Sequence, residues 1–125
     1  MRVGEFLERP AELTGVATDA GPAVTDPAPS LHEVLLASVP APVLRSFRER
    51  LLGPLREYDD RHNAELVTTL KAFLACDGSW SACASRMYVH ANTVRYRISR
   101  VEALTGRDLS ALADRVDFFL ALRGT

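Results

Sequence analysis

Residues 79–104 read SWSACASRMYVHANTVRYRISRVEAL, and this stretch decides the fold. Its pattern predicts two helices joined by a very short turn, the first over about 80–87 and the second over about 90–104. Ser79 is suited to cap the first helix, because a serine hydroxyl accepts a hydrogen bond from an unpaired amide of the first turn. A short helix, a tight turn and a longer second helix make the helix-turn-helix arrangement.

The second predicted helix has one apolar side and one cationic side. Val94, Ile98 and Val101 follow at i, i+4 and i+7, the spacing of an apolar helical stripe. Turning this stripe inward places polar, aromatic and cationic side chains on the opposite face and its flanks. That set contains no acid and consists of Asn92, Thr93, Arg95, Tyr96, Arg97, Ser99 and Arg100.

Such a face suits a polyanion. Arginine can fork onto guanine edges or phosphate oxygens, asparagine can pair with adenine, and a helix of this width fits the major groove. The amides at a helix N-terminus attract anions as well. We therefore predict a double-stranded DNA interface made of Ser79, Ser81, His90, Asn92, Thr93, Arg95, Tyr96, Arg97 and Arg100.

Each of these assignments has a plainer alternative. His90 could cap the second helix instead of touching a phosphate. Tyr96 could pack on the stem of an arginine, and the arginines could form an ordinary solvated face. Their concentration on a face without acids favours DNA contact.

The run VHANTVRYRISRVEALTGRDL, residues 89–109, closely resembles the C-terminal helix-turn-helix of the PucR/CdaR family of bacterial regulators, which is of the Fis-like type. Its most specific part is His-x-Asn-Thr followed by Tyr-Arg, and the resemblance extends over roughly residues 51–123. It implies an all-α fold and a role in transcription regulation, with sensor domains preceding the helix-turn-helix. Ala91 departs from the pattern, because the family usually has arginine there.

The charge of the chain is uneven. The 125 residues carry a net charge of −1, which by itself does not indicate nucleic-acid binding. Residues 86–107, however, contain five arginines against the single acid Glu102, a local charge of +4. A local basic stripe is the footprint expected of nucleic-acid binding. Cys76 and Cys83 lack a C-x-x-C spacing or histidine partners, so we expect them to be small core residues.

We predict an all-α helical bundle in three segments. Residues 1–29 are expected to be a linker or disordered leader, because they are rich in Gly, Pro, Ala, Thr and Asp. Residues 30–58 are expected to form one or two N-terminal helices and to serve as a dimerisation segment. Residues 59–125 are expected to form the helix-turn-helix DNA-binding domain.

Punctuating residues predict the helix ends. Ser30 and Glu33 have capping-box spacing, which starts a helix over 31–39. A helix over 43–52 is expected to end at Gly53 and Pro54. Asn63 is expected to cap a core helix over 64–76, after a solvated charged run over 56–63. The last helix, over 111–122, is expected to turn one side to the core, made of Leu112, Val116, Phe119 and Leu120.

Other function classes find little support in the sequence. No apolar run approaches the ~20 residues that span a bilayer, and no signal peptide opens the chain, so we expect a cytoplasmic location. We find no glycine-rich nucleotide loop, metal cluster or nucleophile–base pair, so we expect neither an enzyme nor a cofactor.

We predict sequence-specific binding of double-stranded DNA, with the helix over 90–104 in the major groove. One such helix reads only a few base pairs, so we expect a homodimer. The chain would be the C-terminal piece of a regulator whose sensor domain is missing, or a short version of one. The alternative is a protein-interaction module that keeps the fold without binding DNA and pairs with a full-length regulator. Ala91 and the acidic net charge favour that alternative.

Overall fold

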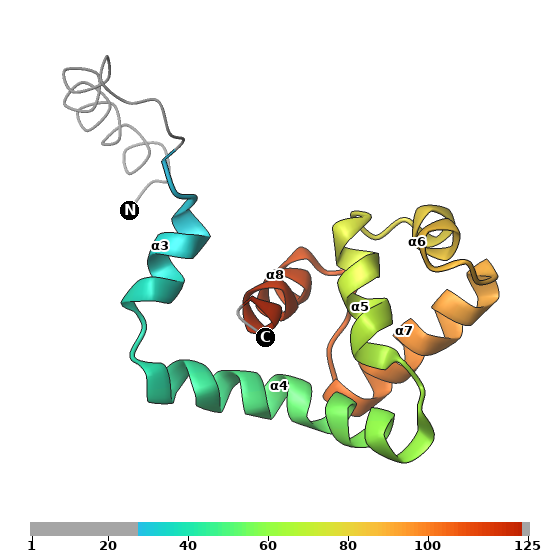
Figure 1. Ribbon diagram of the computed structural model, residues 1–125, viewed down its shortest axis with the longest axis horizontal. Coiled ribbons are helices and arrows are strands. Elements are labelled where there is room, and N and C mark those ends of the chain that lie inside the picture. The colour runs from blue at the N-terminus through green and yellow to red at the C-terminus, as the bar shows by residue number, and fades with distance from the viewer. Residues whose placement is uncertain (1–27, 124–125) are drawn as a thin grey trace. The chain divides into compact units, whose positions relative to one another are not determined.

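The computed structural model describes residues 28–123, and within them it contains six α-helices and no strand (Figure 1). The predicted all-α class is confirmed. The helices are α3 Leu31–Ser38, α4 Ala41–His62, α5 Leu66–Ala75, α6 Trp80–Met87, α7 Ala91–Thr105 and α8 Leu112–Leu122. Residues 32–125 belong to one compact unit. The predicted leader over 1–29 lies almost wholly outside the described residues.

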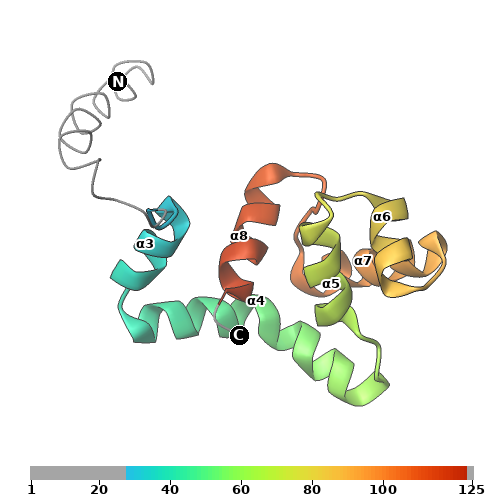
Figure 2. The same ribbon diagram turned by 45° about the horizontal axis from the view of Figure 1, so that its top comes forward.

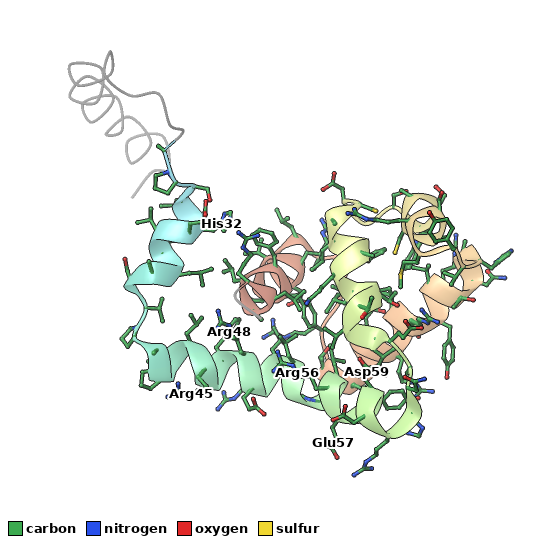
Figure 3. The ribbon with its side chains drawn as sticks, viewed as in Figure 1. His32, Arg45, Arg48, Arg56, Glu57 and Asp59 are labelled. Carbon is green, nitrogen blue, oxygen red and sulfur yellow. The ribbon has the colours of Figure 1, made fainter. Side chains whose placement is uncertain are left out.

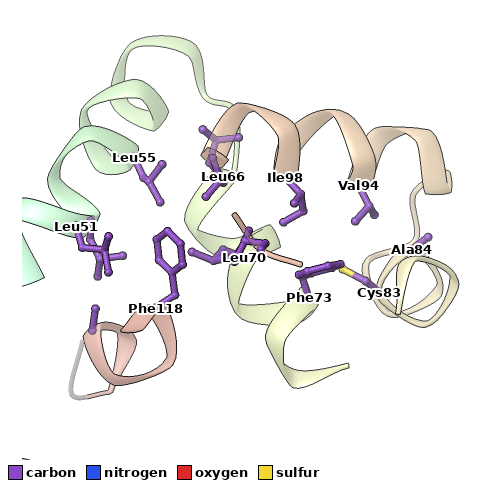
Figure 4. Close-up of a cluster of buried hydrophobic side chains, with 14 residues drawn as sticks. Leu51, Leu55, Leu66, Leu70, Phe73, Cys83, Ala84, Val94, Ile98 and Phe118 are labelled. Atoms are coloured by element: carbon purple, nitrogen blue, oxygen red, sulfur yellow. The ribbon is translucent and has the colours of Figure 1, made fainter. Parts of the chain in front are cut away.

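Helix α5 is the central element of the bundle. It lies between α8 on one side and the α6–α7 pair on the other, while α4 contacts α5, α7 and α8 (Figures 1 and 2). Apolar side chains from every one of these helices meet in a single core (Figure 4). Its largest fully buried members are Phe118, Leu52, Leu55, Leu66, Leu70 and Ile98.

The predicted helix end at Gly53 and Pro54 is wrong, because α4 runs through both residues. A proline inside a helix loses one backbone hydrogen bond and costs about 3 kcal/mol. Leu51, Leu52 and Leu55 beside it are all buried. Burying one leucine contributes about 1.5–3 kcal/mol, so the three together outweigh the proline. The boundary expected after residue 58 also falls within α4.

The junction between α4 and α5 is capped by a residue from the charged run. Asn63, expected to cap α5, instead ends α4 in the left-handed region with a φ of 50°. Asp59 lies near the end of α4 (Figure 3). Its carboxylate accepts hydrogen bonds from the amides of Leu66 and Val67, at 2.7 and 3.0 Å. These are orphan donors of the first turn of α5. Asp59 therefore fixes where α5 begins.

The predicted core face of α8 is also wrong. Leu112, Val116 and Phe119 are 67%, 43% and 37% exposed, whereas Phe118 and Ala121 are fully buried. Leu120 is half-buried. Burial of Phe118 accounts for this rotation of α8, and Arg107 forms ion pairs with Asp114 at 2.9 Å and Asp117 at 2.7 Å. These contacts leave an apolar stripe on the surface.

Candidate nucleic-acid interface

Helices α6 and α7 form the predicted helix-turn-helix. The hydroxyl of Ser79 accepts a hydrogen bond from the amide of Ala82 at 3.2 Å, as its capping role predicted. Helix α6 ends with Tyr88 in the left-handed region, and the amide of Val89 donates to the carbonyl of Ala84 at 3.0 Å. This is the Schellman ending of a helix, and it turns the chain sharply into α7.

His90 is the N-cap of α7. Its Nδ1 accepts a hydrogen bond from the amide of Asn92 at 3.0 Å. A ring nitrogen that accepts has no proton, so the neutral ring carries its proton on Nε2. The side chain is exposed. The capping alternative is therefore found in the structure, and Nε2–H can still donate to an external acceptor.

The buried and exposed sides of α7 follow the predicted pattern. Val94, Ile98 and Val101 are buried, as predicted. The side chains expected on the outward face and its flanks are exposed or half-buried. The exposed ones are Asn92, Arg95, Tyr96 and Ser99, and the half-buried ones are Thr93, Arg97 and Arg100.

Arg95 is positioned by an aromatic ring of α6. Its guanidinium carbon lies 5.3 Å from the centre of the Trp80 ring. Trp80 in turn packs on Phe73 of α5, with 4.8 Å between the ring centres. Cation–π contact of this kind restrains an arginine without neutralising its charge. Arg95 thus keeps its charge on the exposed side of α7. The two serines predicted to contact DNA lie at the start of α6, where Ser79 is half-buried and Ser81 is exposed.

Tyr96 and Arg100 form a second cationic group one turn further on. Arg100 donates a hydrogen bond to the phenolic oxygen of Tyr96 at 3.1 Å. The guanidinium also lies 5.6 Å from the ring centres of Tyr96 and Tyr58. This hydrogen bond, and then the charge of Arg100, lower the pKa of the Tyr96 phenol below its usual 10.0. Tyr96 contacts an arginine and remains 60% exposed.

Arg97, expected on a flank of the second helix, points towards α5. Its side chain is only 18% exposed and lies 3.6 Å from the carboxylate of Glu65. It also donates a hydrogen bond to the hydroxyl of Thr69 at 3.2 Å. This arrangement makes Arg97 a brace between α7 and α5, which the sequence pattern did not reveal.

Fewer arginines are free of ion pairs than the five that residues 86–107 contain. Arg97 and Arg107 are paired with carboxylates of their own chain. Within residues 28–123, no carboxylate forms an ion pair with Arg86, Arg95 or Arg100. Three of the five arginines therefore carry the basic surface of the helix-turn-helix.

Tyr88 is a candidate contact that the sequence reasoning missed. It lies in the turn between α6 and α7 and is 94% exposed. Its φ of 58° is left-handed, a conformation that costs an L-residue roughly 1–2 kcal/mol. An aromatic residue beside a turn usually suggests packing, and only the structure shows that this ring faces solvent next to His90.

The part of the chain that the structure describes has no group of three or more His, Cys, Asp or Glu residues placed to hold a metal ion. Among the same residues, no helix is long and apolar enough to cross a membrane.

Comparison with known proteins places this helix-turn-helix in a family. Residues 66–124 match the PucR C-terminal helix-turn-helix domain. A protein of Thermomonospora curvata from the pkwA 5′ region is 41% identical over 101 residues, which cover 81% of this chain and 54% of that protein. No solved structure gave a significant match.

Two further relatives carry regulatory names. The transcriptional activator PmfR of Paenarthrobacter nicotinovorans is 37% identical over 75 residues, 60% of this chain and 16% of PmfR. The proline-responsive transcriptional activator PutR of Bacillus subtilis is 29% identical over 76 residues, 61% of this chain and 18% of PutR. Residues 66–124 of this chain therefore belong to the family of PucR C-terminal helix-turn-helix domains.

Proposed function

We propose that this chain binds double-stranded DNA sequence-specifically as part of a transcriptional regulator, with α7 in the major groove. The observation that carries the proposal is the exposed side of α7, where Arg95 and Tyr96 reach solvent while Val94 and Ile98 are buried. Helix α6 precedes it at the short turn typical of DNA-binding helix-turn-helix units.

The side chains divide by the chemistry they offer. Asn92 and Arg95 lie on the first two turns of α7, where they would reach base edges. Arg100 and Tyr96 lie further along and would hold the phosphate backbone. The remaining polar groups near the helix starts would also contact phosphates, namely Ser79, Ser81, Tyr88, His90 and Thr93. Arg97 supports this surface from behind, through Thr69 and Glu65.

Ala91 shapes the proposed specificity. It is half-buried at the first position of α7 and packs against the core. A methyl group offers no hydrogen bond, so recognition of base edges would depend on Asn92 and Arg95. The preferred sequence should therefore differ from that of relatives that carry arginine at this position.

The proposed regulator binds DNA as two copies of this chain and also includes a sensor domain. A single recognition helix reads a few base pairs, so two copies would bind half-sites about 34–36 Å apart. Residues 30–58 would supply part of the dimer contact. The relatives are longer than the region they share with this chain, and a sensor domain ahead of the helix-turn-helix would act with it in the cytoplasm.

Selection from random duplex DNA with the purified chain tests this function. The expected result is one enriched motif, arranged as an inverted repeat. Failure to enrich any sequence, at low salt where phosphate contacts are strongest, would contradict the proposal.

The second candidate is a protein-interaction module that keeps this fold. The self-neutralised Arg97 and Arg107 favour it, because they reduce the basic surface to three arginines. Under this reading the chain pairs with a full-length regulator. It predicts no gel retardation of any duplex, together with a stable heterodimer.

A further inference from the structure

The large apolar side chains that remain exposed fall into two groups. Tyr88 and Tyr96 lie on the helix-turn-helix and belong to the proposed DNA surface. The others lie on α3, on the first turn of α4 and on α8, and they are Leu31, Val34, Leu35, Val43, Leu112, Val116 and Phe119. The second group lies outside the proposed DNA surface.

The exposed side of α8 borders a hollow. Its volume is about 260 Å³. Four of its lining residues are apolar, Leu74 of α5 and Leu112, Val116 and Phe119 of α8, and the charged Asp77 and Arg115 complete the lining. Pockets for drug-sized molecules typically measure roughly 300–1,000 Å³. A shallow apolar hollow below that range is better suited to side chains of a protein than to a free ligand.

Helix α3 carries side chains of the matching kind. Val34 and Leu35 are 45% and 54% exposed, and no residue of this eight-residue helix is buried. A helix of that length is marginal in water without apolar cover. The ring of His32 meets the ring of Phe119 edge-on at 4.9 Å, so the start of α3 lies against α8 within one chain.

We propose that these two features bind each other between two copies of the chain. Val34 and Leu35 of one copy enter the hollow at Leu74, Leu112 and Val116 of the other, and the second copy does the same in return. One chain carries both the projecting side chains and the hollow, which is the self-complementarity of a two-fold interface.

The reciprocal arrangement makes a second copy the favoured occupant. Each chain buries its α3 side chains and its α8 hollow at once, so every contact is made twice. Stable interfaces bury about 800 Å² on each partner, more than one short helix supplies alone. This surface deepens the proposed function by adding α8 to the dimer contact. The inference rests on the proposed function only in assuming that two copies bind DNA together.

Sedimentation equilibrium of the 125-residue chain without DNA tests the surface. The expected species has twice the 13.7 kDa mass of one chain. Leu35→Glu and Val116→Arg should each raise the dimer Kd by about a hundredfold or more, because each places an unpaired charge in an apolar contact. Ala103→Glu adds the same negative charge as Leu35→Glu, but at an exposed position of α7, and should leave the Kd within about twofold.

The double variant L35E/V116R distinguishes this geometry from others. In the reciprocal dimer each new glutamate meets a new arginine, so dimerisation should recover by about tenfold or more over either single variant. Pairing of α3 with α3 and of α8 with α8 would instead oppose like charges and give no recovery. A monomeric parent chain, or a double variant no better than the single ones, would overturn the proposal.

Gel retardation separates this inference from the DNA-binding proposal. A monomeric chain that still retards a selected half-site would overturn the interface and leave DNA binding intact. A dimer that responds to these variants as expected but retards no duplex would support the interface and contradict DNA binding.

Discussion

Arg97 of α7 donates a hydrogen bond to the hydroxyl of Thr69 of α5, with 3.2 Å between nitrogen and oxygen. Thr69 is fully buried and donates in turn to the carbonyl of Glu65 at 2.7 Å. The carboxylate of Glu65 lies 3.6 Å from Arg97. This closed set of contacts fixes the rotation of α7 about its axis, and so decides which side chains face solvent.

Arg97→Ala should therefore lower both stability and DNA affinity. Loss of a hydrogen bond from a charged donor at a mostly buried position should cost about 1–2 kcal/mol. For a domain of this size that corresponds to a fall in Tm of roughly 4–15 °C. Thermal unfolding followed by circular dichroism measures it.

Arg95→Ala is the matched control for that experiment. Arg95 is exposed, and its only described partner within residues 28–123 is the Trp80 ring. Its loss should change Tm by less than about 2–4 °C while weakening DNA binding. Equal falls in Tm for the two variants would show that Arg97 stabilises the fold no more than Arg95 does.

Asp59→Ala should destabilise the start of α5. The carboxylate caps the amides of Leu66 and Val67, and loss of such a cap costs about 0.5–2 kcal/mol. Urea unfolding gives the free energy directly. Asp60→Ala removes the neighbouring exposed carboxylate and should have an effect below about 0.5 kcal/mol. If the two variants have the same free energy of unfolding, the Asp59 carboxylate does not cap α5.

The sequence predicted what depends on near neighbours. The Ser79 cap, the ends of α6 and α7, and the stripe of Val94, Ile98 and Val101 all follow from spacings of a few residues, and the structure confirms them. The family resemblance was carried by the same stretch. Local rules suffice there because each helix end has its partner within one turn.

The errors arose where distant contacts decide. Gly53 and Pro54 signal a helix end, but burial of the leucines beside them keeps α4 continuous. Asp59 caps amides seven and eight residues away, beyond any short capping motif. The inward face of α8 is the one that buries Phe118 and Ala121 in the shared core. The spacing of apolar residues alone predicted the wrong core face for α8.

Asp114 should make stability depend on acid pH. A hydrogen bond from the Asp108 amide, and then one from Arg107, lower the pKa of its carboxyl below the usual 3.8. A lowered folded-state pKa means that the charged form stabilises the fold. That contribution is complete above the unfolded pKa and is lost as pH falls through the folded pKa.

Asp114→Asn should therefore reduce stability at neutral pH and flatten the pH dependence between about pH 5 and pH 2. Urea unfolding across that range measures both effects, with Asp60→Asn as the control. An unchanged pH dependence would show that the Asp114 carboxylate does not stabilise the folded state.

Salt dependence should report the phosphate contacts. Each phosphate contact removed should reduce the slope of log K against log salt by about 0.9. Arg100→Ala should produce that change on any duplex, since Arg100 is assigned to the backbone. A variant with the parental slope would show that Arg100 contacts no phosphate.

The most direct test of the central claim is a titration of the selected duplex, at one fixed salt concentration, with parent, Arg95→Ala and Lys71→Ala proteins. Lys71 is an exposed lysine of α5, outside the proposed DNA surface and the proposed dimer segment, so both variants lose one positive charge. Because Arg95 is assigned to a base edge, its variant should bind about ten- to a hundredfold more weakly, and Lys71→Ala should match the parent within about twofold. Parental affinity in Arg95→Ala, or equal losses in both variants, would contradict the reading of DNA by the exposed face of α7.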